Sequence, residues 1–359
     1  SGVFSSRKIA RSLEQDVAFR VLGADNFPAH RTLREFRQVH LAEFSALFVQ
    51  VVQLAREAGL VKLGRIGIDG TKVKANASKR KAMSYGRMRE REAQLKAEIE
   101  ALTRQAEQQD AAEDREHGAD RRGDELPQEL ARREKRLEAI QAAKARLAAR
   151  HREQDREDGR SVDEDGNTRG PGGGVCKRPF GHPEAKAQDN FTDPQSRIMK
   201  AGNGFDQCYN AQAAVDESGL IVATEVIDAG NDTHHLVPMV QATQKNTGAL
   251  PQMALADSNY ASEANFMALE AIQVQACVAL GREGSKERRI DPDTHRATQR
   301  MAERLATPEG QAHYRRRKVI AEPVFGWIKQ AMGFRRFSVR WLAQVNGEWN
   351  LVCLALNLR

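Results

Sequence analysis

The stretch that decides the fold is Arg65-Ile66-Gly67-Ile68-Asp69-Gly70, whose alternating apolar side chains predict a half-buried strand closed by a carboxylate. A second apolar strand, Met253-Ala254-Leu255-Ala256-Asp257-Ser258, is closed in the same way. A third acidic residue, Glu322, follows a basic run and opens a helical apolar pattern. Single acidic residues at strand ends are often only turn formers. Three together can converge on two divalent cations, which is the arrangement that cleaves and transfers phosphodiester bonds.

The predicted elements around these residues follow a recognisable order. Residues 210–216 and 220–227 flank Glu217-Ser218-Gly219 and predict a β-hairpin. A helix over 233–244, the Asp257 strand, a helix over 262–272, a strand over 274–280 and a basic helical segment follow. With one long insert removed, this is a βββαβαβα chain, the order of a ribonuclease-H-like fold: a mixed α/β sheet flanked by helices. The first and fourth strands are neighbours in such a fold, so Asp69 and Asp257 are expected to meet.

Four segments are expected along the chain. Residues 1–60 predict a helical N-terminal region, which is either a structural layer or a DNA-binding unit, and the absence of an initiator Met leads us to expect a truncated start. Residues 61–80 and 176–359 form the expected catalytic domain. Two narrow apolar stripes predict an inserted helical hairpin or short coiled coil over 81–150. The charged and glycine-rich residues 151–175 predict a flexible linker.

The charge balance suits a polyanionic substrate. The net charge is +7. From Gly281 to Arg359 there are 16 Lys and Arg against 8 Asp and Glu, so this segment accounts for the whole excess. A basic patch beside carboxylates attracts a nucleic-acid backbone, although a basic balance alone is a weak indication. The four cysteines include no CxxC pair, which argues against a zinc site or a disulfide scaffold. No apolar run reaches the ~18–20 residues of a membrane span.

Five motifs are distinctive in combination: Asp69-Gly70-Thr71-Lys72-Val73-Lys74-Ala75-Asn76-Ala77-Ser78, Asp193-Pro194-Gln195-Ser196-Arg197-Ile198-Met199, Tyr209-Asn210-Ala211-Gln212, Ala256-Asp257-Ser258-Asn259-Tyr260 and Val319-Ile320-Ala321-Glu322-Pro323-Val324-Phe325-Gly326. Together they resemble the DDE transposases of bacterial insertion sequences, over nearly the whole chain. The resemblance implies a catalytic and metal-binding triad of Asp69, Asp257 and Glu322. It also implies Mg²⁺ as the cofactor, with Mn²⁺ able to substitute.

The same resemblance implies an activity and its partners. The protein would bind the terminal inverted repeats of its element, cleave DNA strands and transfer them to target DNA. A homodimer is expected in the synaptic complex. The implied location is the bacterial cytoplasm, on the nucleoid when the protein is bound to DNA, with no role for a membrane.

Many of these transposases carry a Tyr-x₂-Arg-x₃-Glu-x₆-Lys signature around the glutamate. Glu322 and Lys329 fit this spacing, whereas Tyr314 and Arg317 lie one residue too early and Lys318 stands at the arginine position. A seven-residue helical step would put Lys329 on the same face as Glu322. This favours Lys329 over Arg317 and Tyr314 as a phosphate contact, with an ordinary solvated lysine as the alternative.

The candidate DNA-binding residues are Lys72, Lys74, Arg317, Lys318 and Lys329. Lys72 and Lys74 leave the Asp69 strand and either contact backbone phosphate or only solvate the strand edge. Because Pro323 disfavours helical backbone in the residue before it, Glu322 is expected at a helix start or a kink.

Two other functions stay open at this point. One is a ribonuclease-H-like nuclease or resolvase that uses the same triad without strand transfer. The other is a non-catalytic DNA-binding or coiled-coil descendant of such an enzyme. The three tryptophans, Trp327, Trp341 and Trp349, are expected in the core rather than as platforms for base stacking.

Overall fold

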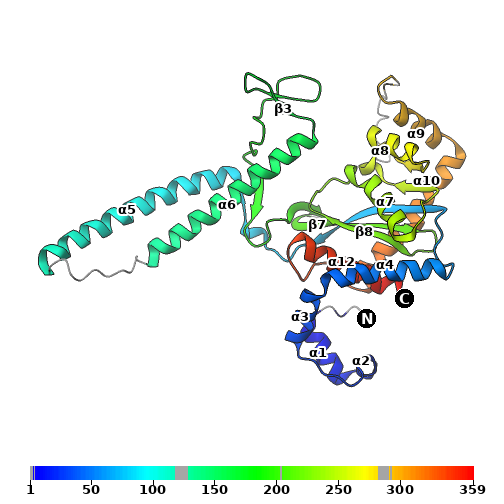
Figure 1. Cartoon of the computed structure of the whole chain (residues 1–359), viewed down its shortest axis with the longest axis horizontal. Helices are drawn as coiled ribbons and strands as arrows, with labels where there is room; N and C mark the ends of the chain where they lie inside the picture. Colours follow the sequence, from blue (N-terminus) through cyan, green and yellow to red (C-terminus); the bar gives the residue numbers. More distant parts are fainter. Residues whose placement is uncertain (1–2, 4, 118–127, 203, 282–290, 292) are drawn as a thin grey trace. The chain divides into compact units, whose positions relative to one another are not determined.

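The chain divides into two compact units in a computed structural model that describes residues 3, 5–117, 128–202, 204–281, 291 and 293–359. Unit 1 comprises Ser1–Asn76 and Met199–Arg359, and unit 2 comprises Ala77–Ile198. Figure 1 labels the helices and strands of both units. Among the described residues, no helix is both long enough and apolar enough to cross a membrane.

The core of unit 1 is an open mixed sheet in the strand order β10-β9-β1-β7-β6, with β8 paired to β7. The strands are β1 (Arg65–Lys74), β6 (Arg197–Ala201), β7 (Gly204–Asp216), β8 (Ile221–Ile227), β9 (Met253–Ala256) and β10 (Gln275–Val278). β1 runs antiparallel to β7 and parallel to β9, and β10 runs parallel to β9. The expected α/β fold is confirmed: this mixed sheet flanked by helices is compatible with a ribonuclease-H-like fold.

The predicted β-hairpin joins β7 to β8. Gly219 has a φ of +84°, a left-handed conformation that glycine adopts without steric cost, and its N–H donates to the Asp216 carbonyl at 3.0 Å. The Asp216 carboxylate accepts the N–H groups of Ser218 and Leu220, each at 2.9 Å. These contacts satisfy the backbone N–H groups of the tight turn that the sequence predicted.

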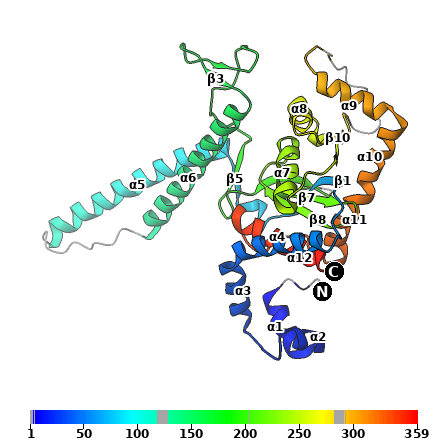
Figure 2. The ribbon, with the colours of Figure 1, turned by 45° about the vertical axis from the view of Figure 1, so that its right-hand side comes forward.

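The helices of unit 1 are α1 (Ser6–Gln15), α2 (Val17–Leu22), α3 (His30–Val39), α4 (Leu41–Glu57), α7 (Leu236–Thr247), α8 (Glu263–Ala271), α9 (Arg296–Ala306), α10 (Pro308–Ile320), α11 (Glu322–Gly326) and α12 (Leu342–Asn357). α4 packs against α12, and α7 and α12 pack against β8 (Figure 2). Trp349 on α12 is fully buried, and its indole N–H donates to the Gln212 carbonyl at 2.9 Å. The expected N-terminal helical region thus belongs to the same compact unit as the sheet.

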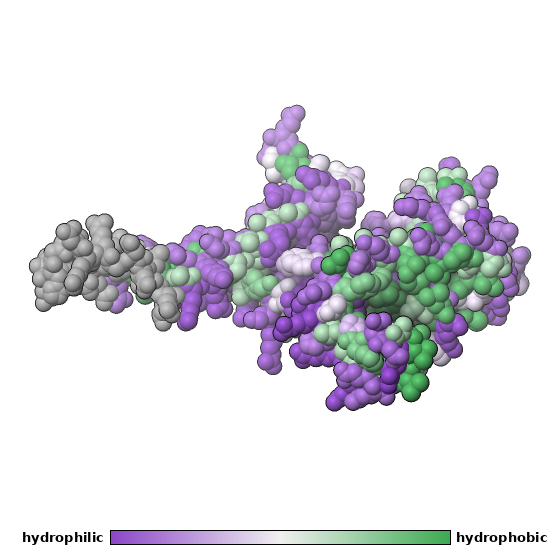
Figure 3. Space-filling view, turned by 60° about the horizontal axis from the view of Figure 1, so that its bottom comes forward, coloured by the Kyte–Doolittle hydropathy of each residue, from purple (hydrophilic) through white to green (hydrophobic). Residues whose placement is uncertain are grey.

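Several apolar side chains remain exposed on the N-terminal helices. They are Val17, Val21, Leu22, Phe36, Val39 and Leu54. Figure 3 brings this side of unit 1 forward and shows hydrophobic residues gathered on it. Exposed apolar groups of this kind are typical of surfaces that associate with another macromolecule.

Unit 2 contains the predicted pair of long helices, α5 (Tyr85–His117) and α6 (Gln128–Glu157). They pack through one apolar cluster made of Met88, Leu95, Ile140, Ala143 and Leu147. Two short strands, β2 (Ala82–Ser84) and β5 (Gln188–Asn190), pair beside the helix ends. Arg146 and Arg150 of α6 both bind the buried Asp189 carboxylate, at 2.6 and 3.0 Å, which fastens β5 to α6.

The structure differs from the linker expected over 151–175. α6 continues to Glu157, and β3 (Ser161–Val162) and β4 (Thr168–Arg169) form a small antiparallel sheet. Buried Asp155 explains the order of this polar segment, because its carboxylate binds Arg160 at 3.2 Å, Arg178, and the N–H of Gly181 at 2.8 Å. The compact unit also extends to residue 198, whereas the expected catalytic domain resumed at 176.

Candidate active site

Asp69 and Asp257 are brought together by the register of two parallel strands. Arg65, Ile66 and Gly67 of β1 lie opposite Met253, Ala254 and Leu255 of β9. Continuing this register by two residues sets Asp69 opposite Asp257.

Asp69 does not close its strand, contrary to the sequence expectation. β1 continues to Lys74 because Thr71 and Val73 maintain pairing with β7. The shorter β9 ends at Ala256, so β1 has no strand neighbour on that side at Asp69. Asp69 owes its accessibility to the end of β9, and its side chain is 20% exposed.

Asp257 lies in the turn between β9 and η3 (Ser258–Tyr260). Its carboxylate accepts the backbone N–H of Asn259 at 2.9 Å and the side-chain amide of Asn259 at 3.2 Å. These bonds fix the orientation of the carboxylate at the strand end.

Glu322 reaches the site because α10 ends against β1. A Cβ atom on Gly67 would lie 3.1 Å from Ile320 and 3.3 Å from Ala321, so glycine allows this close approach without displacing either neighbour. Gly67 and Asp69 share a face of β1, since strand side chains alternate. α11 begins at Glu322 with Pro323 in its first turn, which confirms the expected helix start.

Arg317 connects two of the three carboxylates. Its Nη1 lies 3.2 Å from Asp69 Oδ2, and its Nη2 lies 3.7 Å from Glu322 Oε1. Arg317 is only 8% exposed, and its Nε has no hydrogen-bond partner among the described residues. On one continuous helix, residues five apart point about 140° away from each other. Ala321, between α10 and α11, keeps a right-handed helical conformation (φ −88°, ψ −41°), so the two long side chains themselves span this angular difference.

The electrostatics of the site favour a bound cation. Burial, followed by the nearby negative charge of Asp257, raises the pKa of Asp69 to about 6 from its ordinary 3.8. Burial is also the main reason that the pKa of Asp257 is raised. Two carboxylates that are costly to ionise side by side gain most from a divalent cation between them.

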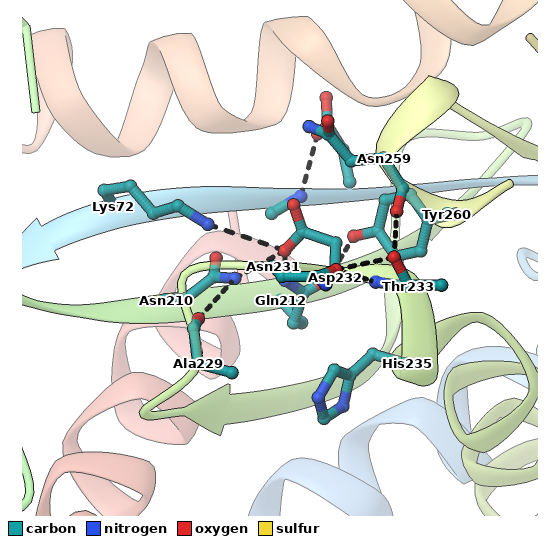
Figure 4. A network of polar contacts seen from close by, with 12 residues as sticks. Lys72, Asn210, Gln212, Ala229, Asn231, Asp232, Thr233, His235, Asn259 and Tyr260 are labelled. Carbon is teal, nitrogen blue, oxygen red and sulfur yellow. Dashed lines mark hydrogen bonds and ion pairs between the residues drawn. The ribbon is translucent and has the colours of Figure 1, made fainter. Parts of the chain in front are cut away.

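A second polar cluster lies on the opposite face of β1, around Asp232 (Figure 4). Asp232 Oδ1 accepts the side-chain amides of Asn210 and Gln212 and lies 3.5 Å from the ammonium group of Lys72. A Cβ atom on Gly70 would lie 2.8 Å from Asn210 Oδ1 and 3.0 Å from Asp232 Oδ1, so Gly70 makes room for this cluster. The sequence carried no signal for Asp232, because a polar Asn231-Asp232-Thr233 before a helix is also an ordinary helix start.

The other candidate cations are spread around the site. Lys74 Nζ pairs with Asp206 at 2.8 Å, and Lys318 is exposed on α10. Lys329 is half-buried in η4 (Trp327–Ala331), a π-helical turn, so the α-helical step assumed from Glu322 does not hold. Burial lowers the pKa of Lys329, and the negative charge of Asp69 opposes this shift.

The sequence analysis expected all three tryptophans in the core, and this expectation was wrong for two of them. Trp349 is buried, whereas Trp327 is 38% and Trp341 is 49% exposed. Trp341 has a φ of +70°, an uncommon conformation for a bulky residue. Phe334 and Phe337 instead fill the core between Tyr209 and Trp349.

The donor chemistry of the three carboxylates fits a hard cation. Oxygen ligands are those that Mg²⁺ and Mn²⁺ prefer. Arg317 occupies the space between Asp69 and Glu322, and no group of three or more His, Cys, Asp or Glu among the described residues is already arranged to hold a metal ion. A metal can replace the positive charge of Arg317 beside Asp69 and Glu322, and it would also offset the repulsion between Asp69 and Asp257.

Comparison with known proteins gives one match. The family described as "Transposase DDE domain" matches residues 175–358, half of the chain. The matched range contains Asp257 and Glu322, and Asp69 lies before it. No curated protein and no solved structure matches the chain.

Proposed function

The chain belongs to the family of transposases with a DDE domain, and from that premise we propose that it cleaves DNA at the ends of a mobile element and joins the freed strands to target DNA. One observation carries the proposal. The register of β1 and β9 sets Asp69 opposite Asp257, and Arg317 links Asp69 to Glu322.

Asp69, Asp257 and Glu322 are the proposed catalytic residues and metal ligands. Members of this family act with divalent metal ions, and we propose Mg²⁺ here, with Mn²⁺ as a substitute. When bound, such ions activate a water or a 3′-hydroxyl and neutralise the charge that develops on the phosphate. The protein's own part is to hold the carboxylates: Asn259 orients Asp257, the β1–β7 pairing holds Asp69, and the end of α10 against Gly67 carries Glu322.

Basic side chains are the proposed contacts to the DNA backbone. They are Lys72, Lys74, Arg317, Lys318 and Lys329. Arg317 has a double role in this proposal. It neutralises Asp69 and Glu322 when no metal is bound, and its planar guanidinium suits a phosphate once the carboxylates bind metal instead.

Two copies of the chain are proposed to act together on paired DNA ends. The exposed apolar side chains on α2 and α3, such as Val21, Phe36 and Val39, support a protein–protein surface on this unit. Light scattering with and without a duplex that carries the element ends would measure the stoichiometry. A complex holding one chain per duplex pair would contradict the homodimer.

The function is tested by incubating a labelled duplex bearing candidate element ends with Mg²⁺ and the full chain, beside the Asp257→Ala variant. Joined products that disappear in the variant are expected. Nicking without joining would indicate a nuclease or resolvase instead. Binding with no cleavage in either Mg²⁺ or Mn²⁺ would refute the catalytic proposal.

A further inference from the structure

Asp232 is a buried acidic residue to which the proposed reaction assigns no role. It is 5% exposed and lies between β8 and α7, directly before η2 (Thr233–His235). A buried carboxylate is costly unless it is paired and hydrogen-bonded. The hydrogen bonds and the ion pair of the Asp232 carboxylate therefore indicate its role.

The polar contacts of the Asp232 carboxylate with Asn210, Gln212 and Lys72 converge on one oxygen, Oδ1 (Figure 4). Two of the donors are neutral amides, from Asn210 and from Gln212 at 2.6 Å. The remaining partner is the Lys72 ammonium at 3.5 Å. The amides come from the same strand, β7, and are held further because the Tyr260 hydroxyl donates to Gln212 Oε1. Asp232 Oδ1 is thus fixed by two amides of the sheet, and Lys72 is its charged partner.

Lys72 connects this cluster to the proposed active site. It lies on β1 three residues after Asp69, and its side chain projects from the opposite face of the strand. That side chain is 21% exposed. Asp257 and Asp69 both attract its charge. Asn210, the cross-strand neighbour of Lys72, also has a buried Oδ1 with no hydrogen-bond partner among the described residues. A long lysine side chain has many rotamers, and fixing it beside one carboxylate removes most of them.

We propose that Asp232 is a positioning residue that acts through Lys72, holding its ammonium group at the edge of the β1–β9 pair, where it contacts the DNA phosphate next to the cleaved bond. This inference rests on the proposed function, because it assumes that DNA binds at Asp69 and Asp257. An ammonium group that is already held in position can contact the phosphate in the transition state without first ordering the lysine side chain. Its position therefore affects the rate of the chemical step more than the affinity for DNA.

The test is a double-mutant cycle with Asp232→Asn, Lys72→Met and both together, measuring single-turnover nicking at saturating DNA and Mg²⁺. Asp232→Asn is suited to this test because the amide oxygen can accept the same contacts that converge on Oδ1, so only the charge is lost. Each single variant is expected to slow nicking about 10- to 150-fold, the range for one hydrogen bond to a charged group. The double variant is expected to be no slower than Lys72→Met within about threefold, because Asp232 has nothing left to position.

Three further readings separate this role from the alternatives. The KM for DNA is expected to stay within about threefold, and the Tm of Asp232→Asn within about 4 °C of the parent. Asp206→Asn, which removes the partner of Lys74 on the same strand, is the matched control and should slow nicking less than threefold. Losses that multiply in the double variant, or an equal loss in Asp206→Asn, would overturn the proposal while leaving the proposed function standing. A parent protein that never nicks DNA would instead refute the function on which the proposal rests.

Discussion

Asp69→Asn should stabilise the metal-free protein at neutral pH although it removes a proposed catalytic group. The pKa of Asp69 is raised to about 6 from 3.8, chiefly by burial and by Asp257. The folded state therefore binds the Asp69 proton more tightly than the unfolded state does. Stability consequently falls as the pH rises from about 4 to about 6 and stays low above that range. Because each pK unit corresponds to ~1.4 kcal/mol, the ionised side chain costs about 3 kcal/mol at pH 8.

The neutral amide in Asp69→Asn avoids this cost, which is already net of the attraction of Arg317 at 3.2 Å. We therefore expect the free energy of unfolding to rise by about 1–3 kcal/mol at pH 8 and to change little at pH 4, where Asp69 is already protonated. Urea unfolding of the full chain in EDTA, followed at both pH values, measures this difference. Glu270→Gln, at an exposed ion pair with Arg300, is the control and should show no such pH-dependent gain. Equal effects of Asp69→Asn at pH 4 and pH 8, or a loss at pH 8, would refute the raised pKa and the crowding of charge behind it.

Three further predictions address the same site. Metal binding requires ionised Asp69, so the affinity for Mn²⁺, measured by calorimetry, should fall as the pH drops below about 6, and a constant affinity from pH 5 to 8 would contradict this. Gly67→Val should destabilise the protein by about 1–3 kcal/mol in thermal unfolding and should slow nicking, because its Cβ would lie 3.1 Å from Ile320. Gly204→Ala is the control and should have neither effect, because a Cβ at that position would have no neighbour within 4 Å. Arg317→Lys should slow nicking by about tenfold or more, because one ammonium cannot replace the planar guanidinium at a phosphate, and an unchanged rate would rule out that phosphate contact.

The sheet was largely readable from local patterns. The alternation at Ile66 and Ile68, the Glu217-Ser218-Gly219 turn and the apolar run before Asp257 each produced the predicted element, because strand alternation and tight turns are patterns of residues close in sequence. The end of β1 was wrong because a strand's length depends on its partners. β7 continues to pair with β1 as far as Lys74.

The linker predicted from composition after α6 is instead an ordered segment. Residues 151–175 have the composition of a linker, yet Asp155 collects Arg160 and Arg178 into one buried ion cluster. Composition counts charges and does not tell which of them will be paired. Residue type likewise does not decide burial: Trp341 was expected in the core and is half exposed.

The sequence by itself determined the fold class, the family resemblance and the three acidic residues, because these rest on residue types and on periodicities within short segments. Only the tertiary structure decided how Arg317 and Asp232 relate to them. Arg317 meets Asp69 because α10 packs against β1, and Asp232 meets Lys72 because β1 and β8 both pair with β7. These contacts depend on packing between segments far apart in the chain, a distance over which local sequence patterns carry no information.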